Sequence, residues 1–345
     1  MSLPLKPDYA PMEANSALKV PEGPQWQYEP KWDGFRCLAF RDGDHIELQS
    51  KSGQPLARYF PEVVEAVKRV KANKFVIDGE IVVEVDGKLS FNDLLQRIHP
   101  AESRIKRLAS EHPATLIVFD LLVDEHGKSL VDLPLADRRP RLEAFARKYF
   151  LKAGDVVLSP ATPSLAKARK WFETMIGDLD GIIAKRTDVP YQSGNREGML
   201  KIKNLRTADC VVGGFRYASK GKVVGSLLLG LYDDAGLLHH VGFTSGIAAN
   251  QRKELTAKLE KLIEPPGFTG AAPGGPSRWS TERSTEWEPL KPELVVEIQY
   301  DHFAGGRFRH GTKLLHWRPD KQPRQCTMKQ VKRDTRSPLN LLKAG

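Results

Sequence analysis

The segment EPKWDGFRCLAF, which runs from Glu29 to Phe40, holds a lysine that could act as a nucleophile on a nucleotide. Lys31 is followed by Asp33 and then by Arg36, so charged groups accompany it within a largely apolar stretch. A lysine attacks a phosphate only after its amine has lost a proton, and burial or neighbouring cations favour that state. An isolated lysine is ordinarily a solvated side chain, so the case for Lys31 depends on what the rest of the chain supplies.

Such a reaction also needs carboxylates for a metal ion, cations for the phosphates and a flat ring for the base. Glu80 lies in the apolar run VIDGEIVV, where a carboxylate is costly unless it binds something. Phe119 lies in the similar run LIVFDLL. In MLKIKN, Lys201 and Lys203 are two positions apart and therefore leave the same face of a strand. The chain thus contains every part, and oxygen ligands of this kind suit Mg²⁺ or Mn²⁺.

Each of these features also has an ordinary structural interpretation. Asp–Gly pairs are commonly turns, so we expect Asp33 and Asp78 to be structural. A phenylalanine in an apolar run is more often part of the core than a base-stacking ring, and alternating lysines usually form a solvated sheet face. The occurrence of all these features in one chain, in this order, favours the functional interpretation.

The composition indicates a globular protein that binds a polyanion. A chain of 345 residues with 40% hydrophobic and 28% charged residues suits two domains. Its formal net charge of +10 favours nucleic acid, because cationic surfaces gain affinity by releasing phosphate counterions. No run of about 18 apolar residues could span a membrane, and no secretory signal begins the chain. The three cysteines lie too far apart for a zinc site or a disulfide framework, so we expect a protein of the reducing cytoplasm.

The first 200 residues or so predict an α+β domain. Residues 73–91 read as a β-hairpin whose turn is Asp86-Gly87, and PATLIVFDLLV and LDGIIAKR are further strands. The spacing of valines in PEVVEAVKRVKA predicts a helix. A second helix is predicted from Ser164 to Gly177.

From Asp209 onward, short glycine-punctuated strands with one intervening helix predict a small β-barrel of the OB-fold type. We place the boundary in KNLRTAD, which gives domains at 1–204 and 205–345. The second domain ends in a basic tail. Because only about 30 residues precede Lys31, we expect the two domains and this tail to clamp a nucleic acid without a separate N-terminal domain.

The sequence KWDGFR, Lys31 to Arg36, resembles the KxDGxR nucleophile motif of the covalent nucleotidyltransferases, which include DNA ligases, RNA ligases and mRNA capping enzymes. Further segments resemble motifs Ia, III, IIIa, IV, V and VI of that superfamily in order, namely SKSG (50–53), DGE (78–80), VFDLL (118–122), DGIIAK (180–185), LKIK (200–203) and RPDK (318–321). Within the superfamily the chain most resembles the small bacterial ATP-dependent DNA ligases, and its length is similar to that of the C-type ligases of actinobacteria.

This resemblance implies that Lys31 attacks the α-phosphate of ATP, forms a lysyl-AMP and releases pyrophosphate. It also implies ATP-binding roles for Glu29, Arg36, Lys51, Glu80, Phe119, Lys185, Lys201, Lys203, Arg318 and Lys321. Glu29 would accept from the adenine amine and Phe119 would stack on the base. Glu80 would hold the ribose or a metal ion, Mg²⁺ or Mn²⁺, and Asp180 would hold the metal ion, either closer than a glutamate would or through water. Asp180 stands where the family usually has glutamate, and Lys51 where it usually has arginine, which removes a bidentate fork.

The RPDK segment, with Arg318, Asp320 and Lys321, belongs to the second domain. The resemblance implies that Arg318 and Lys321 reach the β- and γ-phosphates when that domain closes over the nucleotide. Closure needs a hinge, for which Asp209 is the candidate, although Asp209 could equally cap the first strand of the barrel.

The implied substrate is nicked double-stranded DNA, sealed by a monomer in DNA repair, with a repair polymerase or Ku as candidate partners. An RNA ligase or a GTP-using capping enzyme is an alternative, but Glu29 favours adenine, whose amine donates, over guanine. A non-catalytic nucleic-acid-binding protein is a more remote alternative, since it would be expected to have lost Lys31 or the phosphate-binding lysines.

Overall fold

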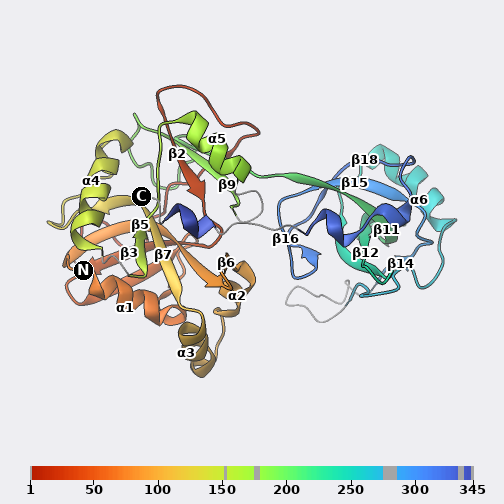
Figure 1. Cartoon of the computed structure of the whole chain (residues 1–345), viewed down its shortest axis with the longest axis horizontal. Coiled ribbons are helices and arrows are strands. Elements are labelled where there is room, and N and C mark those ends of the chain that lie inside the picture. The colour runs from red at the N-terminus through yellow and green to blue at the C-terminus, as the bar shows by residue number, and fades with distance from the viewer. Residues whose placement is uncertain (1, 151–153, 175–178, 275–285, 333–337, 343–345) are drawn as a thin grey trace. The chain divides into compact units, whose positions relative to one another are not determined.

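The computed structural model describes residues 2–150, 154–174, 179–274, 286–332 and 338–342. Contacts divide the chain into two compact units (Figure 1). Unit 1 comprises Met1–Asn204 together with Thr335–Gly345, and unit 2 comprises Leu205–Asp334. The last residues of the chain therefore group with unit 1, whereas the domain boundaries predicted from the sequence place them in the second domain.

Unit 1 contains two sheets. In the larger sheet the strands lie in the order β4 (His45–Ser50), β3 (Phe35–Asp42), β5 (Lys74–Val85), β7 (Ala114–Val123) and β8 (Val156–Leu158), and β6 (Lys88–Leu89) pairs with β5. In the smaller sheet the order is β1 (Asn15–Ser16), β10 (Met199–Lys203), β9 (Gly181–Arg186) and β2 (Trp26–Lys31). The helices of this unit are α1 (Pro61–Arg69), α2 (Phe91–Gln96), α3 (Glu102–Glu111), α4 (Leu135–Tyr149) and α5 (Leu165–Thr174).

The local elements that the sequence predicts in this unit are present. The hairpin of β5 and β6 turns at Asp86 and Gly87, whose φ angles of 51° and 76° are those of a tight two-residue turn. Helix α5 begins directly after Ser164, whose hydroxyl accepts from the amide of Lys167 at 3.2 Å. Its predicted end at Gly177 lies outside the described residues.

Neighbouring residues of β3 face two different cores, because side chains alternate across a strand. Cys37 and Ala39 belong to a core that includes residues of α1 and α4, the helices that lie beside this sheet in Figure 1. Leu38 and Phe40 belong to a second core on the opposite face. Arg36 shares the face of Leu38 and Phe40, so the strand directs it away from the helices.

Unit 2 is rich in strands, as the sequence predicts. Its main sheet has the order β13 (Leu238–Thr244), β12 (Val224–Tyr232), β11 (Arg206–Tyr217), β15 (Val295–Tyr300) and β18 (Lys313–Trp317), with β14 (Glu288–Pro289) paired to β11. A small hairpin joins β16 (Phe303–Ala304) to β17 (Arg307–Phe308), and α6 (Arg252–Glu260) is the helix that the sequence predicts between the strands. The ladders do not close this sheet into a barrel, but its edges meet at an isolated bridge between Thr244 and Thr312.

The C-terminal segment returns to unit 1. The short 3₁₀ helix η6 (Pro338–Leu341) lies among its strands in Figure 1. Leu339, Leu341 and Leu342 pack against a core of unit 1 that includes Val82 of β5. Apolar contacts therefore fix this segment, for which the sequence predicted only a basic tail.

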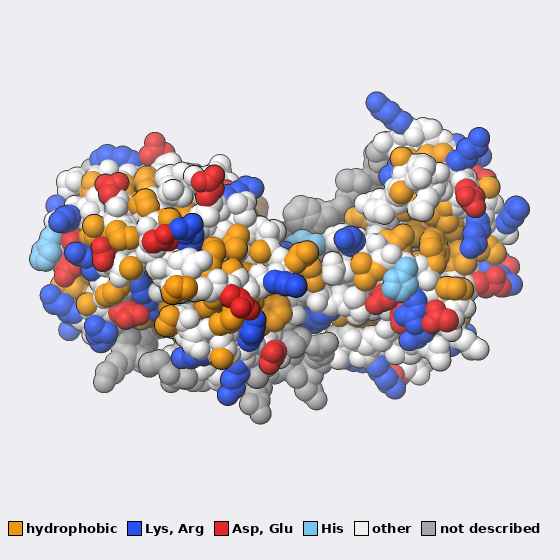
Figure 2. Space-filling model, turned by 90° about the horizontal axis from the view of Figure 1, so that it is seen from above, with side chains coloured by type: hydrophobic (Ala, Val, Ile, Leu, Met, Phe, Trp, Pro, Cys, Tyr) orange, Lys and Arg blue, Asp and Glu red, His pale blue; other side chains and the backbone are white. Residues whose placement is uncertain are grey.

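Lysine and arginine side chains are spread over the surfaces of both units (Figure 2). This distribution is consistent with the formal charge of +10. In the part of the chain that the structure describes, no helix is long and apolar enough to cross a membrane.

Candidate active site

Unit 1 contains a pocket of about 220 Å³ into which both sheets direct polar side chains. Strands β2 and β3 and the turn after β4 contribute Glu29, Lys31, Arg36 and Lys51. Strands β5, β7, β9 and β10 contribute Glu80, Phe119, Lys185 and Lys201. The structure thus brings together candidate residues from distant segments of the sequence.

Lys31 forms an ion pair with Asp180 at one side of this pocket. The backbone supports the contact, because the Asp180 amide donates to the Lys31 carbonyl at 3.2 Å and Lys31 pairs with Gly181 in the β2–β9 ladder. Gly181 has a φ of +147°, and a Cβ there would lie 1.9 Å from the carbonyl oxygen of Ile202. Glycine at this position therefore allows β9 and β10 to approach closely beside the candidate nucleophile.

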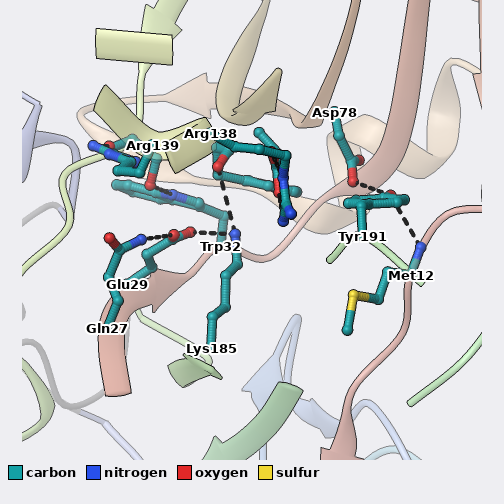
Figure 3. A network of polar contacts seen from close by, with 12 residues as sticks. Met12, Gln27, Glu29, Trp32, Asp78, Arg138, Arg139, Lys185 and Tyr191 are labelled. Atoms are coloured by element: carbon teal, nitrogen blue, oxygen red, sulfur yellow. Dashed lines mark hydrogen bonds and ion pairs between the residues drawn. The ribbon is translucent and has the colours of Figure 1, made fainter. Parts of the chain in front are cut away.

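Glu29 is almost fully buried and pairs with Lys185 at 2.8 Å. Figure 3 shows Gln27 completing the arrangement, and its amide donates to Glu29 at 2.8 Å. The Lys185 ammonium also lies 4.6 Å from the centre of the Phe119 ring, and the Arg36 guanidinium lies at the same distance. A carboxylate, an aromatic ring and two cations therefore adjoin one another, as recognition of a base next to a phosphate requires.

Arg36 is held by a chain of polar contacts that the sequence did not indicate. Its guanidinium donates twice to the fully buried Asp78, at 2.5 and 2.6 Å, and once to the Met12 carbonyl at 3.2 Å. The Tyr191 hydroxyl donates to Asp78 at 2.6 Å and accepts from the Met12 amide at 3.0 Å (Figure 3). Asp78 lies inside β5, in the first strand of the predicted hairpin, and its contact with Arg36 is the structural role expected of it. A carboxylate buried in an apolar strand was the available signal, as it was for Glu80.

Glu80 lies opposite Arg36 in the β3–β5 ladder and accepts from the Gly34 amide at 3.1 Å. Burial raises the pKa of Glu80 to about 7, against the opposing effect of the charges of Arg36 and Lys31. A desolvated carboxylate with this pKa gains from a divalent cation, which favours its ionised form. Glu80 therefore fits the predicted role of a metal ligand, and the other predicted ligand, Asp180, is in contact with the nucleophile.

Several cations lie close together around Lys201, which lines the pocket. Burial, followed by the charges of Lys31, Lys51, Lys203 and Arg196, lowers the pKa of Lys201. Such a concentration of positive charge favours binding of a polyphosphate. Lys203 leaves the same face of β10 as Lys201 and pairs with Gly181, but it does not line the pocket.

The N-terminal segment supplies one wall of the pocket, which was not expected from the sequence. Residues 11–14 line it, and the Glu13 carboxylate pairs with Lys51 and Arg196 at 2.8 Å each. The hydrogen bond from Lys51 lowers the pKa of Glu13. These positions carry no periodic pattern, so the only sequence signal was an acidic residue before the first long strand.

Trp32, next to Lys31, is part of a core and also lines the pocket, and its indole donates to the Ser159 hydroxyl at 2.9 Å.

The remaining predicted residues lie in unit 2. Arg318, Asp320 and Lys321 come directly after β18, and Asp209 lies inside β11. Arg318 and Lys321 both pair with Asp209, at 3.0 and 2.9 Å. The predicted hinge role of Asp209 stays a prediction.

Comparison with protein families matches both units. A model described as the ATP dependent DNA ligase domain matches residues 9–203, and a model described as the ATP dependent DNA ligase C terminal region matches residues 220–321.

Comparison with individual proteins gives the same family. DNA ligase C1 of Mycolicibacterium smegmatis is 45% identical over 99% of this chain and 97% of that protein. DNA ligase C of Mycobacterium tuberculosis is 42% identical over 96% of each chain. A multifunctional non-homologous end joining protein, LigD of Mycobacterium bovis, is 30% identical over 87% of this chain but only 37% of its own length.

Two solved structures share the fold at low sequence identity. The structure described as Pmar-Lig_Pre matches with a TM-score of 0.57 and 18% identity, covering 85% of this chain and 63% of that one. A Lig E DNA ligase structure matches with a TM-score of 0.56 and 16% identity, covering 89% of this chain and 99% of that one.

Proposed function

The chain belongs to the ATP-dependent DNA ligase family, as a ligase of the small C-type, and from this membership we propose that it seals nicks between 5′-phosphate and 3′-hydroxyl ends in duplex DNA through a lysyl-AMP on Lys31. The observation that carries the proposal is the position of Lys31. It lines one pocket together with the carboxylate of Glu29, the ring of Phe119 and the cation of Lys201, the groups that a nucleotide's base and phosphates need. An RNA ligase or a capping enzyme is less well supported, because the full-length relatives are DNA ligases.

ATP is the nucleotide of this family. In the proposed complex Phe119 stacks on adenine, and Glu29 accepts from the exocyclic amine with a lone pair not used by Gln27 or Lys185. Arg36 lies near the ribose. Lys185, Lys201 and Lys203 hold the α-phosphate. Arg318 and Lys321 contact the outer phosphates.

A divalent cation, Mg²⁺ or Mn²⁺, is proposed at Glu80 and Asp180, which have the oxygen ligands that these ions prefer. When bound, the ion would neutralise charge on the phosphates. Glu80 offers a desolvated carboxylate that gains from such a partner. The Asp180 contact with Lys31 must break or rearrange for Asp180 to serve.

In the first step the Lys31 amine loses a proton to solvent, after its contact with Asp180 has been given up for the metal ion. The Nζ lone pair then attacks the α-phosphorus. The bond to the bridging oxygen breaks, and pyrophosphate leaves with that electron pair. Fixed cations at Lys185 and Lys201 stabilise the charge that builds on the phosphoryl oxygens, without reorganisation during the step.

In the later steps AMP passes from Lys31 to the 5′-phosphate of the nick, and the 3′-hydroxyl then displaces AMP to join the strand. Positive charge over both units supplies phosphate contacts that do not depend on sequence. A role in DNA repair on the bacterial nucleoid follows by analogy with the end-joining relatives. A repair polymerase or Ku as partner, and action as a monomer, are parts of the same proposal.

Intact-mass measurement tests the first step. The purified chain should gain one AMP with ATP and a divalent cation, and pyrophosphate should remove it. Lys31→Ala should abolish the gain, whereas Lys74→Ala, at an exposed lysine that pairs with Asp42 away from the pocket, should not. Labelling by GTP and not by ATP would refute the proposed donor. Nick sealing that survives Lys31→Ala would refute the proposed nucleophile.

A further inference from the structure

Two cations of unit 2 converge on one buried carboxylate. Asp209 is 8% exposed, and its two oxygens accept separately, from Arg318 Nη1 at 3.0 Å and from Lys321 Nζ at 2.9 Å. Arg318 and Lys321 themselves keep about a quarter of their side-chain surface exposed, at 25% and 29%. The carboxylate therefore lies beneath the two cations, and the cations face solvent.

The backbone of Asp209 is fixed on both sides. On one side it pairs with Glu297 in the ladder between β11 and β15. On the other side, the pairing of β11 with β12 begins only at Val211. At Asp209 the Gln330 side chain supplies the hydrogen bonds that a neighbouring strand would make. The Gln330 amide oxygen accepts from the Asp209 amide at 3.0 Å, and its nitrogen donates to the Asp209 carbonyl at 3.1 Å. The carboxylate is thus carried by a backbone position that lies in a ladder on one side and accepts and donates hydrogen bonds with Gln330 on the other.

A second acid fixes the rotation of the guanidinium. Arg318 donates from Nε and Nη2 to Asp320 at 2.9 and 2.8 Å, while Nη1 is directed to Asp209. These contacts use three of the five guanidinium hydrogens, and Lys321 uses one of its three for Asp209. Donors remain on both side chains for a further anion. Two cations with fixed spacing suit the adjacent oxygens of a diphosphate better than an isolated phosphate.

We propose that Asp209 is a positioning residue that aligns Arg318 and Lys321 as one rigid pair of cations for the leaving pyrophosphate of ATP. This inference rests on the proposed function, since it concerns the step in which Lys31 displaces pyrophosphate. It gives Asp209 a task that differs from that of a hinge. A positioning residue serves only the step that uses its cations, whereas a hinge serves every step that requires the units to rearrange.

The test separates the two half-reactions in the full chain. Asp209→Asn keeps the shape but removes the charge, and it should lower kcat/KM for lysyl-AMP formation from ATP by about tenfold or more. Sealing of a nick that already carries AMP on its 5′-phosphate needs no pyrophosphate contact and should stay within about twofold of wild type. Asp209→Glu, which restores the charge on a longer arm, should recover part of the loss.

A double-mutant cycle makes the assignment specific. Lys321→Met should impair lysyl-AMP formation, and adding Asp209→Asn to it should cost much less than Asp209→Asn costs alone, because the two side chains act as a unit. Asp233→Asn, at another carboxylate of unit 2 that pairs with His239, is the matched control and should behave as wild type.

Several outcomes would overturn the inference. Equal losses in both half-reactions would assign Asp209 to the hinge. Faster lysyl-AMP formation in Asp209→Asn would mean that the carboxylate restrains the cations instead of aligning them. Full additivity with Lys321→Met, accompanied by a lower Tm, would leave only a structural role. Failure of the proposed function would look different, because wild type itself would then form no lysyl-AMP.

Discussion

At the scale of single residues, Glu80 lowers the stability of the folded chain at neutral pH, and the same carboxylate is a proposed ligand of the metal ion. Burial raises its pKa from 4.5 to about 7, so between these pH values the folded chain keeps a proton that the unfolded chain has lost. The folded state therefore loses stability as pH rises through this window, and the loss is complete above about pH 7. A metal ion or ribose that binds the ionised form would recover it.

Replacing this carboxyl group should make the folded chain more stable and lysyl-AMP formation slower. Glu80→Gln should raise the free energy of unfolding by roughly 3 kcal/mol at pH 8 and by little at pH 4, because only the ionised group is penalised. The same variant should form lysyl-AMP more slowly. Urea unfolding at the two pH values measures the first effect and adenylation kinetics the second. Glu84→Gln, at an exposed position of the same strand, is the control. An equal gain at both pH values would contradict the argument.

Wild-type lysyl-AMP formation should also fall as pH decreases through about 7, because protonation of Glu80 removes a candidate ligand. In Glu80→Gln the slope in this range should be shallower at saturating metal. A profile with an unchanged slope would assign the pH dependence to another group. Initial rates measured from about pH 6 to about pH 8 are sufficient for this comparison.

The site residues that could be identified from the sequence carry a local signal, and those that could not are defined by contacts with distant positions. Glu80 could be selected because a carboxylate in an apolar run is costly by itself, and Lys31 and Lys201 because they belong to short motifs that occur in a fixed order along the chain. Tyr191 could not, because its contact with Asp78 joins positions 113 residues apart and nothing near either residue indicates the other. Long-range hydrogen-bond partners of this kind depend on how the sheets are arranged.

At the scale of elements, the approach of β9 to β10 depends on Gly181. A methyl group there would meet the Ile202 carbonyl at 1.9 Å, in a backbone conformation that side chains rarely adopt. Gly181→Ala should therefore destabilise the chain by about 3 kcal/mol or more and displace Lys31, which pairs with residue 181.

Gly43→Ala provides a comparison at an open position. Its φ of 65° lies in the left-handed region, which is less strained than the φ of Gly181, and apart from its chain neighbours no heavy atom lies within 4 Å of where its methyl group would stand. This substitution should cost only about 1 kcal/mol and leave lysyl-AMP formation unchanged. Chemical denaturation of both variants provides the comparison. Equal costs would contradict the argument that the close approach destabilises Gly181→Ala.

The elements with a strong period were predictable, and those without one were not. The turn at Asp86-Gly87 and the helix α1 follow from local preferences that the tertiary structure does not oppose. Residues 11–14 have no such pattern, and they line the pocket because Tyr191, Arg36 and Lys51 bind them. Their position is therefore a property of the folded unit and not of the segment.

At the scale of the whole molecule, the excess positive charge should make DNA binding strongly dependent on salt. If the protein contacts several phosphates, raising the salt concentration from about 50 to about 200 mM should weaken binding of nicked duplex by on the order of 10³-fold. Lysyl-AMP formation should change far less, because ATP releases fewer counterions. Fluorescence anisotropy measures the binding of nicked duplex, and adenylation assays in the same buffers measure the rate of lysyl-AMP formation. A similar response in both would argue against an extended DNA-binding surface.

The return of residues 338–342 to unit 1 gives the chain an unusual connectivity. Unit 2, Leu205–Asp334, is in effect a domain inserted into unit 1 and joined to it by two covalent links. A single cut in either link would therefore leave the two units attached through the other, at a high effective concentration. Cleavage in one link should therefore leave a two-piece protein that stays together as long as residues 338–342 remain packed in unit 1.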